Sequence, residues 1–122
     1  MKLTTGIDLL EIKRMEQSLQ HPRFYTRVFS DAEREMFEQK GRRTESIAAN
    51  FCAKEAFSKA LGAGVRGFGL NEVSVLRDSL GAPYFVFEGR AGELVKQRKL
   101  TFSVSLTHTA EYAAAFVVAM EG

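Results

Sequence analysis

Cysteine, tryptophan and proline are scarce in this sequence, and each scarcity excludes a class of protein. The single cysteine, Cys52, cannot form a disulfide within the chain. No apolar run approaches the ~18 residues that a membrane-spanning helix needs, and the first residues lack the apolar stretch of a secretory signal. Two prolines and ten glycines are too few for a flexible spacer. These absences predict a soluble cytoplasmic protein without a membrane segment.

Positive and negative charges are nearly balanced. The 17 lysines and arginines exceed the 15 aspartates and glutamates slightly, which gives a formal net charge of +2. Dedicated nucleic-acid binders are more basic, and the absence of tryptophan gives no support for a base-stacking surface. The 45% hydrophobic and 26% charged residues are typical of a globular domain. At ~100–200 residues per domain, the chain is expected to form a single domain over 1–122.

The hydrophobic pattern predicts an α+β fold, in which a small, mostly antiparallel sheet packs against one long helix and shorter helices. The long helix is residues 46–61, which are rich in alanine and are followed by Gly62. Residues 11–40 have helical periodicity that Pro22 interrupts. A capping box formed by Ser30 and Glu33 opens the later helix of this segment. The other expected elements are a helix over 89–99 and strands over 4–12, 71–77, 84–88, 101–107 and 112–120.

Charged residues are rare in the predicted long helix. At 100° per residue, Phe51, Glu55 and Lys59 share one face, whereas Lys54 points elsewhere. On an exposed face Glu55 and Lys59 would form an ordinary ion pair worth ~0.2–0.5 kcal/mol. The apolar surroundings favour a different interpretation, because charges on a buried helix are costly unless they are paired or bind a ligand.

Two further polar residues stand out from their surroundings. Asp8 interrupts an apolar, strand-like run, where it either occupies a turn or supplies a hard oxygen ligand to a divalent cation. His108 follows an alternating strand and is flanked by Ser105, Thr107 and Thr109. It is either a surface residue of a hairpin turn or part of a phosphate site, since hydroxyls, an imidazole and turn amides all donate hydrogen bonds.

Three segments together resemble the holo-[acyl-carrier-protein] synthase family of 4′-phosphopantetheinyl transferases. GIDLLEIKR at 6–14 is similar to the opening G-x-D-x-x-x-x-x-R of that family. FCAKEAFSKALG at 51–62 resembles the signature F/W-x-x-K-E-A-x-x-K-A-x-G, and SLTHT at 105–109 resembles the hairpin S-[IL]-[ST]-H-[ST]. Each segment alone is a weak signal, but their order and spacing along nearly the whole chain are specific.

The resemblance implies a reaction and its catalytic residues. Coenzyme A would donate its phosphopantetheine arm to a serine of an apo acyl carrier protein of fatty acid biosynthesis, and 3′,5′-ADP would leave. Asp8 and Glu55 would bind Mg²⁺ together with waters and a pyrophosphate oxygen. Glu55, directly or through a metal-held water, would accept the serine proton. Lys59 would neutralise the phosphate under attack or protonate the leaving group.

The resemblance also implies contacts with coenzyme A. The residues that it assigns to coenzyme A are Lys59, Gly62, Pro83, His108, Thr109 and Arg42, of which Pro83 lies beside the adenine and Arg42 reaches the 3′-phosphate. A second arginine that is common in the family just before the signature aromatic is Asn50 in this chain. This departure weakens the expected 3′-phosphate contact, and Arg43 or Lys40 would have to compensate.

The resemblance further implies two kinds of protein partner. An acidic acyl carrier protein would dock on Arg14, Phe24 and Arg27, with contacts that weaken in salt. Family members are typically homotrimers with active sites between subunits, and the almost entirely apolar strand over 112–120 is compatible with burial in such an assembly. The length of one unit and the start at Met1 favour a free-standing protein over a fragment of a multifunctional synthase.

Two other functions are compatible with parts of the same pattern. The chain could be a non-catalytic module that binds coenzyme A or a nucleotide, or a structural subunit whose buried charges pair with one another. The presence of Asp8, Glu55 and Lys59 together favours the enzyme, because a binding module would be expected to have lost one of them.

Overall fold

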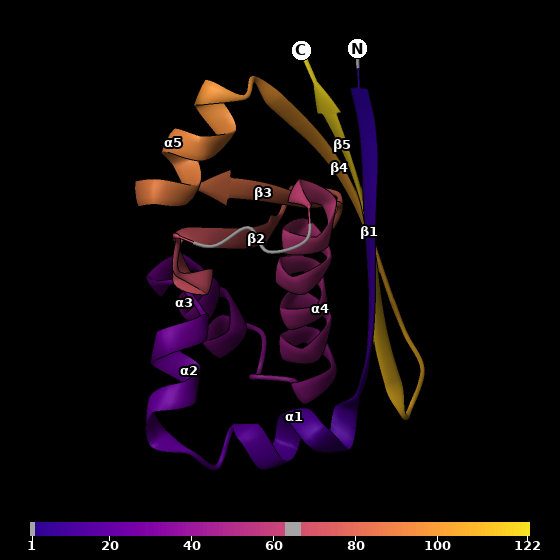
Figure 1. Cartoon of the computed structure of the whole chain (residues 1–122). Helices are drawn as coiled ribbons and strands as arrows, with labels where there is room; N and C mark the ends of the chain where they lie inside the picture. The colour runs from indigo at the N-terminus through magenta and orange to yellow at the C-terminus, as the bar shows by residue number, and fades with distance from the viewer. Residues whose placement is uncertain (1, 63–66) are drawn as a thin grey trace.

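The computed structural model describes residues 2–62 and 67–122, and Figure 1 shows the arrangement of its elements. The elements in chain order are β1 (Lys2–Glu11), α1 (Ile12–Ser18), α2 (Pro22–Val28), α3 (Asp31–Gln39), α4 (Thr44–Leu61), η1 (Leu70–Glu72), β2 (Val73–Arg77), β3 (Pro83–Phe87), α5 (Gly89–Gln97), β4 (Leu100–His108) and β5 (Tyr112–Glu121). The α+β class is confirmed, and the expected strands and long helix lie within a few residues of their predicted bounds. In the described part of the chain, no helix is long and apolar enough to cross a membrane.

The strands form two antiparallel sheets rather than one. Three strands pair in the order β1-β5-β4, and β2 pairs with β3. The apolar strand β5 is central in the three-stranded sheet, but a single chain buries only one of its faces. Alternate residues such as Val117 are buried against the interior, whereas Phe116 and Met120 on the other face remain exposed.

Helix α4 packs along the inner face of the three-stranded sheet, beside β1 (Figure 1). It begins two residues earlier than predicted and is buried on most of its surface. Contact with β1 is close because Gly6 has no side chain: a Cβ at this position would lie 1.9 Å from the carbonyl oxygen of Ala56. This close approach sets the position of the neighbouring Asp8 relative to α4.

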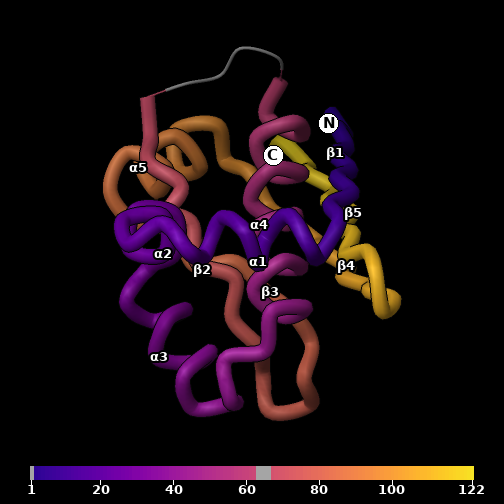
Figure 2. The backbone as a smooth tube through the Cα atoms, turned by 90° about the horizontal axis from the view of Figure 1, so that it is seen from below, coloured from indigo at the N-terminus to yellow at the C-terminus, as the bar shows by residue number. Residues whose placement is uncertain are grey.

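The charged segment before α4 folds into three short helices, whereas its sequence suggested two pieces. Pro22 is at the first turn of α2, which explains the break between α1 and α2. The predicted capping box is confirmed, because Ser30 Oγ accepts from Glu33 N at 3.1 Å and Glu33 Oε1 accepts from Ser30 N at 3.0 Å. Figure 2 shows how α1 crosses the end of α4 before the chain turns into α2 and α3.

Candidate functional site

Three of the predicted site residues meet where β1 packs on α4. Lys59 Nζ donates to Asp8 Oδ1 at 3.2 Å and to the carbonyl oxygen of Ile7 at 2.8 Å. Asp8 and Glu55 line one pocket of about 320 Å³, and Phe51 lines it beside Glu55 as the helical spacing predicts. We call Asp8, Glu55 and Lys59 the acidic-lysine cluster. The other lining residues are Leu9, Leu10, Arg14, Met15, Ser18 and Phe24.

Local structure explains why this cluster forms. Asp8 lies two residues after Gly6 on β1, so both point to the same face of the strand, toward α4. On α4, Glu55 and Lys59 are one turn apart and therefore share a face. Only 18% of the Asp8 side chain is exposed, compared with 56% for Lys59. The lysine amine thus reaches over the half-buried carboxylate from the solvent side.

Cys52 lies on α4, three residues before Glu55, and is fully buried in the hydrophobic core. The pKa of its thiol is raised to about 12, first by burial, then by the negative charge of Asp8 and a hydrogen bond with it, and then by the charge of Glu55. The thiol remains protonated at neutral pH, which excludes a nucleophilic role for it.

The carboxylates of Asp8 and Glu55 suit a magnesium ion better than a metal that needs three or more protein ligands. Among residues 2–62 and 67–122, no group of three or more histidines, cysteines or acids is placed to hold a metal. Mg²⁺ commonly takes one or two carboxylates and completes its shell with water and substrate phosphate. Asp8 and Glu55, which line the same pocket, therefore fit this ion.

The residues that the resemblance assigns to carrier docking lie partly at this pocket. Arg14 and Phe24 line it from α1 and α2. Arg27 is exposed in the last turn of α2 but does not line the pocket. Arg14 and Phe24 thus form a basic and aromatic rim at the pocket of Asp8 and Glu55. Arg27 lies on α2, three residues after Phe24.

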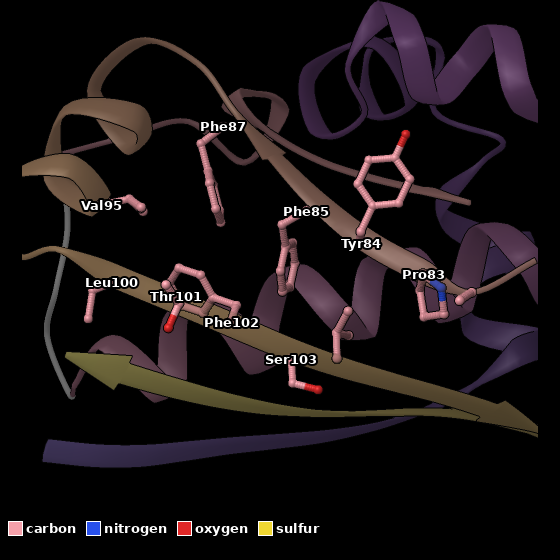
Figure 3. A pocket seen from close by; sticks show the side chains of 11 residues that line it. Pro83, Tyr84, Phe85, Phe87, Val95, Leu100, Thr101, Phe102 and Ser103 are labelled. Atoms are coloured by element: carbon pink, nitrogen blue, oxygen red, sulfur yellow. The ribbon is translucent and has the colours of Figure 1, made fainter. Parts of the chain in front are cut away.

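Of the expected coenzyme A residues, Lys59 belongs to the acidic-lysine cluster, whereas the others do not line the pocket of Asp8 and Glu55 within one chain. His108 ends β4, where it pairs with Ala113 of β5, and it is exposed. Thr109 forms the adjoining turn, with its Oγ1 accepting from the N–H groups of residues 111 and 112. Pro83 lines a different pocket, of about 590 Å³, between β3 and β4, where Figure 3 shows it at one end of the lining, next to Tyr84.

Gly62 and Arg42 also lie apart from one another. Gly62 caps α4 with a φ of 118°. Arg42 has a φ of 51°, and its guanidinium lies 4.3 Å from the ring centroid of Tyr25 and 3.9 Å from a carboxylate oxygen of Glu38. Arg42 therefore lies between α3 and α4 and contacts α2 and α3, and it does not line the neighbouring pocket that Lys40 and other cations line.

Lys54 points away from Glu55, as the helical wheel predicts, and is fully buried. Its amine donates to Glu33 Oε1 at 2.5 Å and to the carbonyl oxygens of Leu70 and Val73 at 2.9 and 2.5 Å. Burial lowers the pKa of Lys54, and the charge of Glu33 opposes that shift. The sequence did not reveal Glu33 as this partner, because its place in the capping box already accounted for it.

Replacing Lys54 by methionine should destabilise the protein. Glu33 would remain fully buried without its cation, a loss that costs about 3 kcal/mol in comparable buried pairs. Urea unfolding of Lys54→Met, compared with the double variant Glu33→Gln/Lys54→Met, measures this. We expect the double variant to recover part of the loss; if both unfold at the wild-type urea concentration, the pair contributes nothing to stability.

Comparisons with known proteins agree along the whole chain. The family model described as the 4′-phosphopantetheinyl transferase superfamily matches residues 4–117. A holo-[acyl-carrier-protein] synthase from Fusobacterium nucleatum is 35% identical over 120 residues, covering 97% of this chain and 98% of the relative. The enzyme of the same name from Clostridium beijerinckii is 38% identical over 119 residues, covering 97% of each.

Solved structures show the same fold. The holo-[acyl-carrier-protein] synthase from Neisseria meningitidis superposes with a TM-score of 0.89 at 29% identity, covering 97% of this chain and 98% of that one. A complex of the synthase with coenzyme A from Chronobacterium ammoniagenes gives a TM-score of 0.88 at 28% identity, covering 100% and 99% of the two chains.

Proposed function

The chain belongs to the 4′-phosphopantetheinyl transferase superfamily, and we propose that it is a holo-[acyl-carrier-protein] synthase that transfers the phosphopantetheine arm of coenzyme A to a serine of an apo acyl carrier protein. Curated relatives of that name align over nearly the whole chain, and a synthase of the same fold binds coenzyme A. The observation that carries the proposal is the shared pocket of Asp8 and Glu55, with Lys59 bound to Asp8.

The acidic-lysine cluster supplies the groups that the transfer needs. The serine oxygen forms a bond to the phosphorus that carries the pantetheine arm, and Glu55 accepts the serine proton, directly or through a water. The bond from that phosphorus to the bridging oxygen of the pyrophosphate breaks, and its electron pair leaves on 3′,5′-ADP. Lys59 neutralises charge on the phosphate under attack or protonates the leaving group.

Asp8 and Glu55 would hold Mg²⁺. When bound, the ion supplies positive charge that offsets the charge of the pyrophosphate. The half-buried Asp8 is kept in place by Lys59 and by its position on the rigid strand β1. The chain's own contribution is therefore a fixed pair of carboxylates that face one pocket.

The acyl carrier protein is proposed to dock at the rim of this pocket. Arg14 and Arg27 are exposed on α1 and α2, and Phe24 lies between them in sequence and lines the pocket. An acidic partner would be steered to these cations, and the association rate would fall with ionic strength. Such docking would place the partner's serine next to Glu55.

A homotrimer with active sites between copies is also part of the proposal. The outer face of the three-stranded sheet exposes large apolar side chains that are paired across β1 and β5, including Leu3 with Met120 and Ile7 with Phe116. Exposed apolar surface of this kind marks an interaction site. His108 lies outside the pocket of Asp8 in the same chain, so a neighbouring copy is the proposed source of the coenzyme A contacts there.

Mixing two impaired variants tests this shared site. Asp8→Ala and His108→Ala should each lose most activity, whereas trimers that contain both variants should regain roughly a third of the wild-type sites, because one of the three interfaces in a mixed cyclic trimer combines both intact residues. Co-expression with two affinity tags and assay of the doubly purified assembly measures this. Activity no higher than that of the separate variants would contradict a site shared between copies.

The activity itself is tested by incubation with coenzyme A, Mg²⁺ and an apo acyl carrier protein, followed by intact-mass analysis of the carrier. We expect the carrier to gain one phosphopantetheine arm, EDTA to prevent the gain, and added magnesium to restore it. Binding of coenzyme A with no mass gain on any of several carriers would favour the non-catalytic binding module instead.

A further inference from the structure

Lys54 and Glu33 are the two charged side chains that have no exposed surface in the described part of the chain. The Lys54 amine donates to Glu33 Oε1 and to the carbonyl oxygens of Leu70 and Val73. An ammonium group has three N–H donors, so each donor has its own acceptor. The proposed reaction uses neither side chain, although Lys54 directly precedes Glu55 on α4.

Stability alone does not require an ion pair at this place. Apolar side chains of similar volume often give the same stability as a buried ion pair, or more. What apolar side chains lack is direction, because a hydrogen bond weakens steeply when its angle departs from linear. The three bonds of Lys54 therefore specify an orientation, in addition to any stability that they contribute.

Helix α4 has few large side chains that could fix its rotation about its own axis. Five of its 18 residues are alanines, and all five are buried. The alanines are Ala48, Ala49, Ala53, Ala56 and Ala60. Helices interlock where ridges of side chains fit into the grooves of a neighbour, and alanine makes only low ridges. Directed hydrogen bonds therefore matter more for the rotation of α4 than for that of a helix with large interlocking side chains.

The acceptors of the Lys54 amine are themselves fixed. Two of them are backbone carbonyl oxygens of η1 and β2. The third belongs to Glu33, whose Oε1 also accepts from the backbone N–H of Ser30 and whose Oε2 accepts from that of Val75 at 3.2 Å. Lys54 thus connects α4 to the start of α3 and to β2.

The opposite side of α4 is held by β1. Ala56 follows Lys54 by two residues, which places it roughly 200° around the helix. Gly6 lets β1 approach so closely there that a Cβ would lie 1.9 Å from the Ala56 carbonyl oxygen. Helix α4 is therefore held by β1 on one side and by the bonds of Lys54 on the other, and Glu55 is the residue between these two contacts.

We infer that Lys54 is a positioning residue of the proposed reaction: its hydrogen bonds set the rotation of α4 about its axis and thereby hold Glu55 toward the pocket of Asp8. This inference rests on the proposed function, which gives Glu55 its role. A rotation of about 20° would move a group on the helix surface, ~5–6 Å from the axis, by about 2 Å. A misplacement of about 1 Å can lower a rate about 100-fold. A small rotation of α4 would therefore impair catalysis in a protein that remains folded.

The first test separates positioning from stability. Lys54→Met should lower kcat about 10-fold or more, while the KM for the carrier stays within about twofold, because Lys54 does not line the pocket at which the carrier is proposed to dock. The double variant Glu33→Gln/Lys54→Met has no unpaired buried charge and should be more stable, but it still lacks the amine. We expect its kcat to stay as low as that of Lys54→Met. A kcat that recovers together with stability would overturn the inference.

Ile47→Ala is the matched control. Ile47 is fully buried and precedes Lys54 by seven residues, so both lie on the same face of α4. Its truncation destabilises the protein through a lost apolar contact and removes no directed hydrogen bond. At a temperature where circular dichroism shows every variant folded, Ile47→Ala should keep kcat near the wild-type value. A loss equal to that of Lys54→Met would contradict positioning by directed bonds. If Lys54→Met does not fold, the double variant takes its place in this comparison.

A measurement of the helix itself separates this inference from the proposed reaction. In a weakly aligned sample, the residual dipolar couplings of the N–H groups along α4 follow the 3.6-residue period, and their phase reports the rotation of the helix. The double variant should shift this phase by about 20°, the rotation that displaces Glu55 by about 2 Å, and Ile47→Ala should not. An unchanged phase in the double variant overturns the inference even if transfer is observed, whereas a shifted phase supports it even if no carrier is modified.

Discussion

Glu55→Gln should lower kcat by about 100- to 10,000-fold, the range expected for loss of a general base. Glutamine has nearly the same shape as glutamate, but its amide cannot accept the serine proton and is a poorer metal ligand. The measurement is the steady-state rate of carrier modification at saturating coenzyme A and Mg²⁺. The affinity for the carrier should change little, because docking is assigned to the rim around Arg14 rather than to Glu55.

Glu45→Gln is the control for this variant. Glu45 lies in the first turn of the same helix, α4, and does not line the pocket of Asp8. Both proteins should give the wild-type circular dichroism spectrum, and only Glu55→Gln should lose turnover. Full activity of folded Glu55→Gln with Mg²⁺ would show that the proton acceptor is another group.

Gly6→Ala should have the largest effect on stability. The new Cβ would lie 1.9 Å from the carbonyl oxygen of Ala56 and 2.9 Å from the amide nitrogen of Ala60, so β1 and α4 would have to separate. Overpacking against movable side chains costs about 1–3 kcal/mol. Here the obstacle is helix backbone, and we expect a loss of more than about 3 kcal/mol, measured by urea unfolding.

Gly92→Ala is the matched control for Gly6→Ala. At Gly92 the nearest atom to a new Cβ is the carbonyl oxygen of Phe87 at 3.5 Å, an ordinary contact, and alanine favours the helix α5. This variant should be as stable as the wild type or more stable. If Gly6→Ala unfolds at the same urea concentration as Gly92→Ala, the close approach of β1 to α4 does not limit stability.

The sequence predicted those features that depend on local spacing. The capping box at Ser30, the alternating strand β4 and the shared face of Glu55 and Lys59 all follow from residues within one or two turns or strand repeats, and each is confirmed. The family resemblance then predicted that Asp8, which precedes Glu55 by 47 residues, belongs to the same site. Local periodicity alone could not have placed it there.

Contacts between distant buried residues were not predictable in the same way. The ion pair of Lys54 with Glu33 joins positions that are 21 residues apart in the sequence. The hydrogen bond from Arg77 to Asn50 joins positions that are 27 residues apart. Glu33 is part of a helix cap and Arg77 comes just before a turn, so each had an ordinary local explanation. Only the packing of α3 and β2 against α4 reveals that these polar groups form one buried network.

The central claim is that Asp8 and Glu55 bind one shared divalent cation, and a titration with Mn²⁺ in the presence of coenzyme A, followed by electron paramagnetic resonance, tests it most directly. The wild type should bind one ion per chain. Asp8→Asn and Glu55→Gln should each abolish most of this binding, and the double variant should lose little more, since ligands of one ion are not additive. Wild-type affinity in either single variant would show that the two carboxylates do not share an ion.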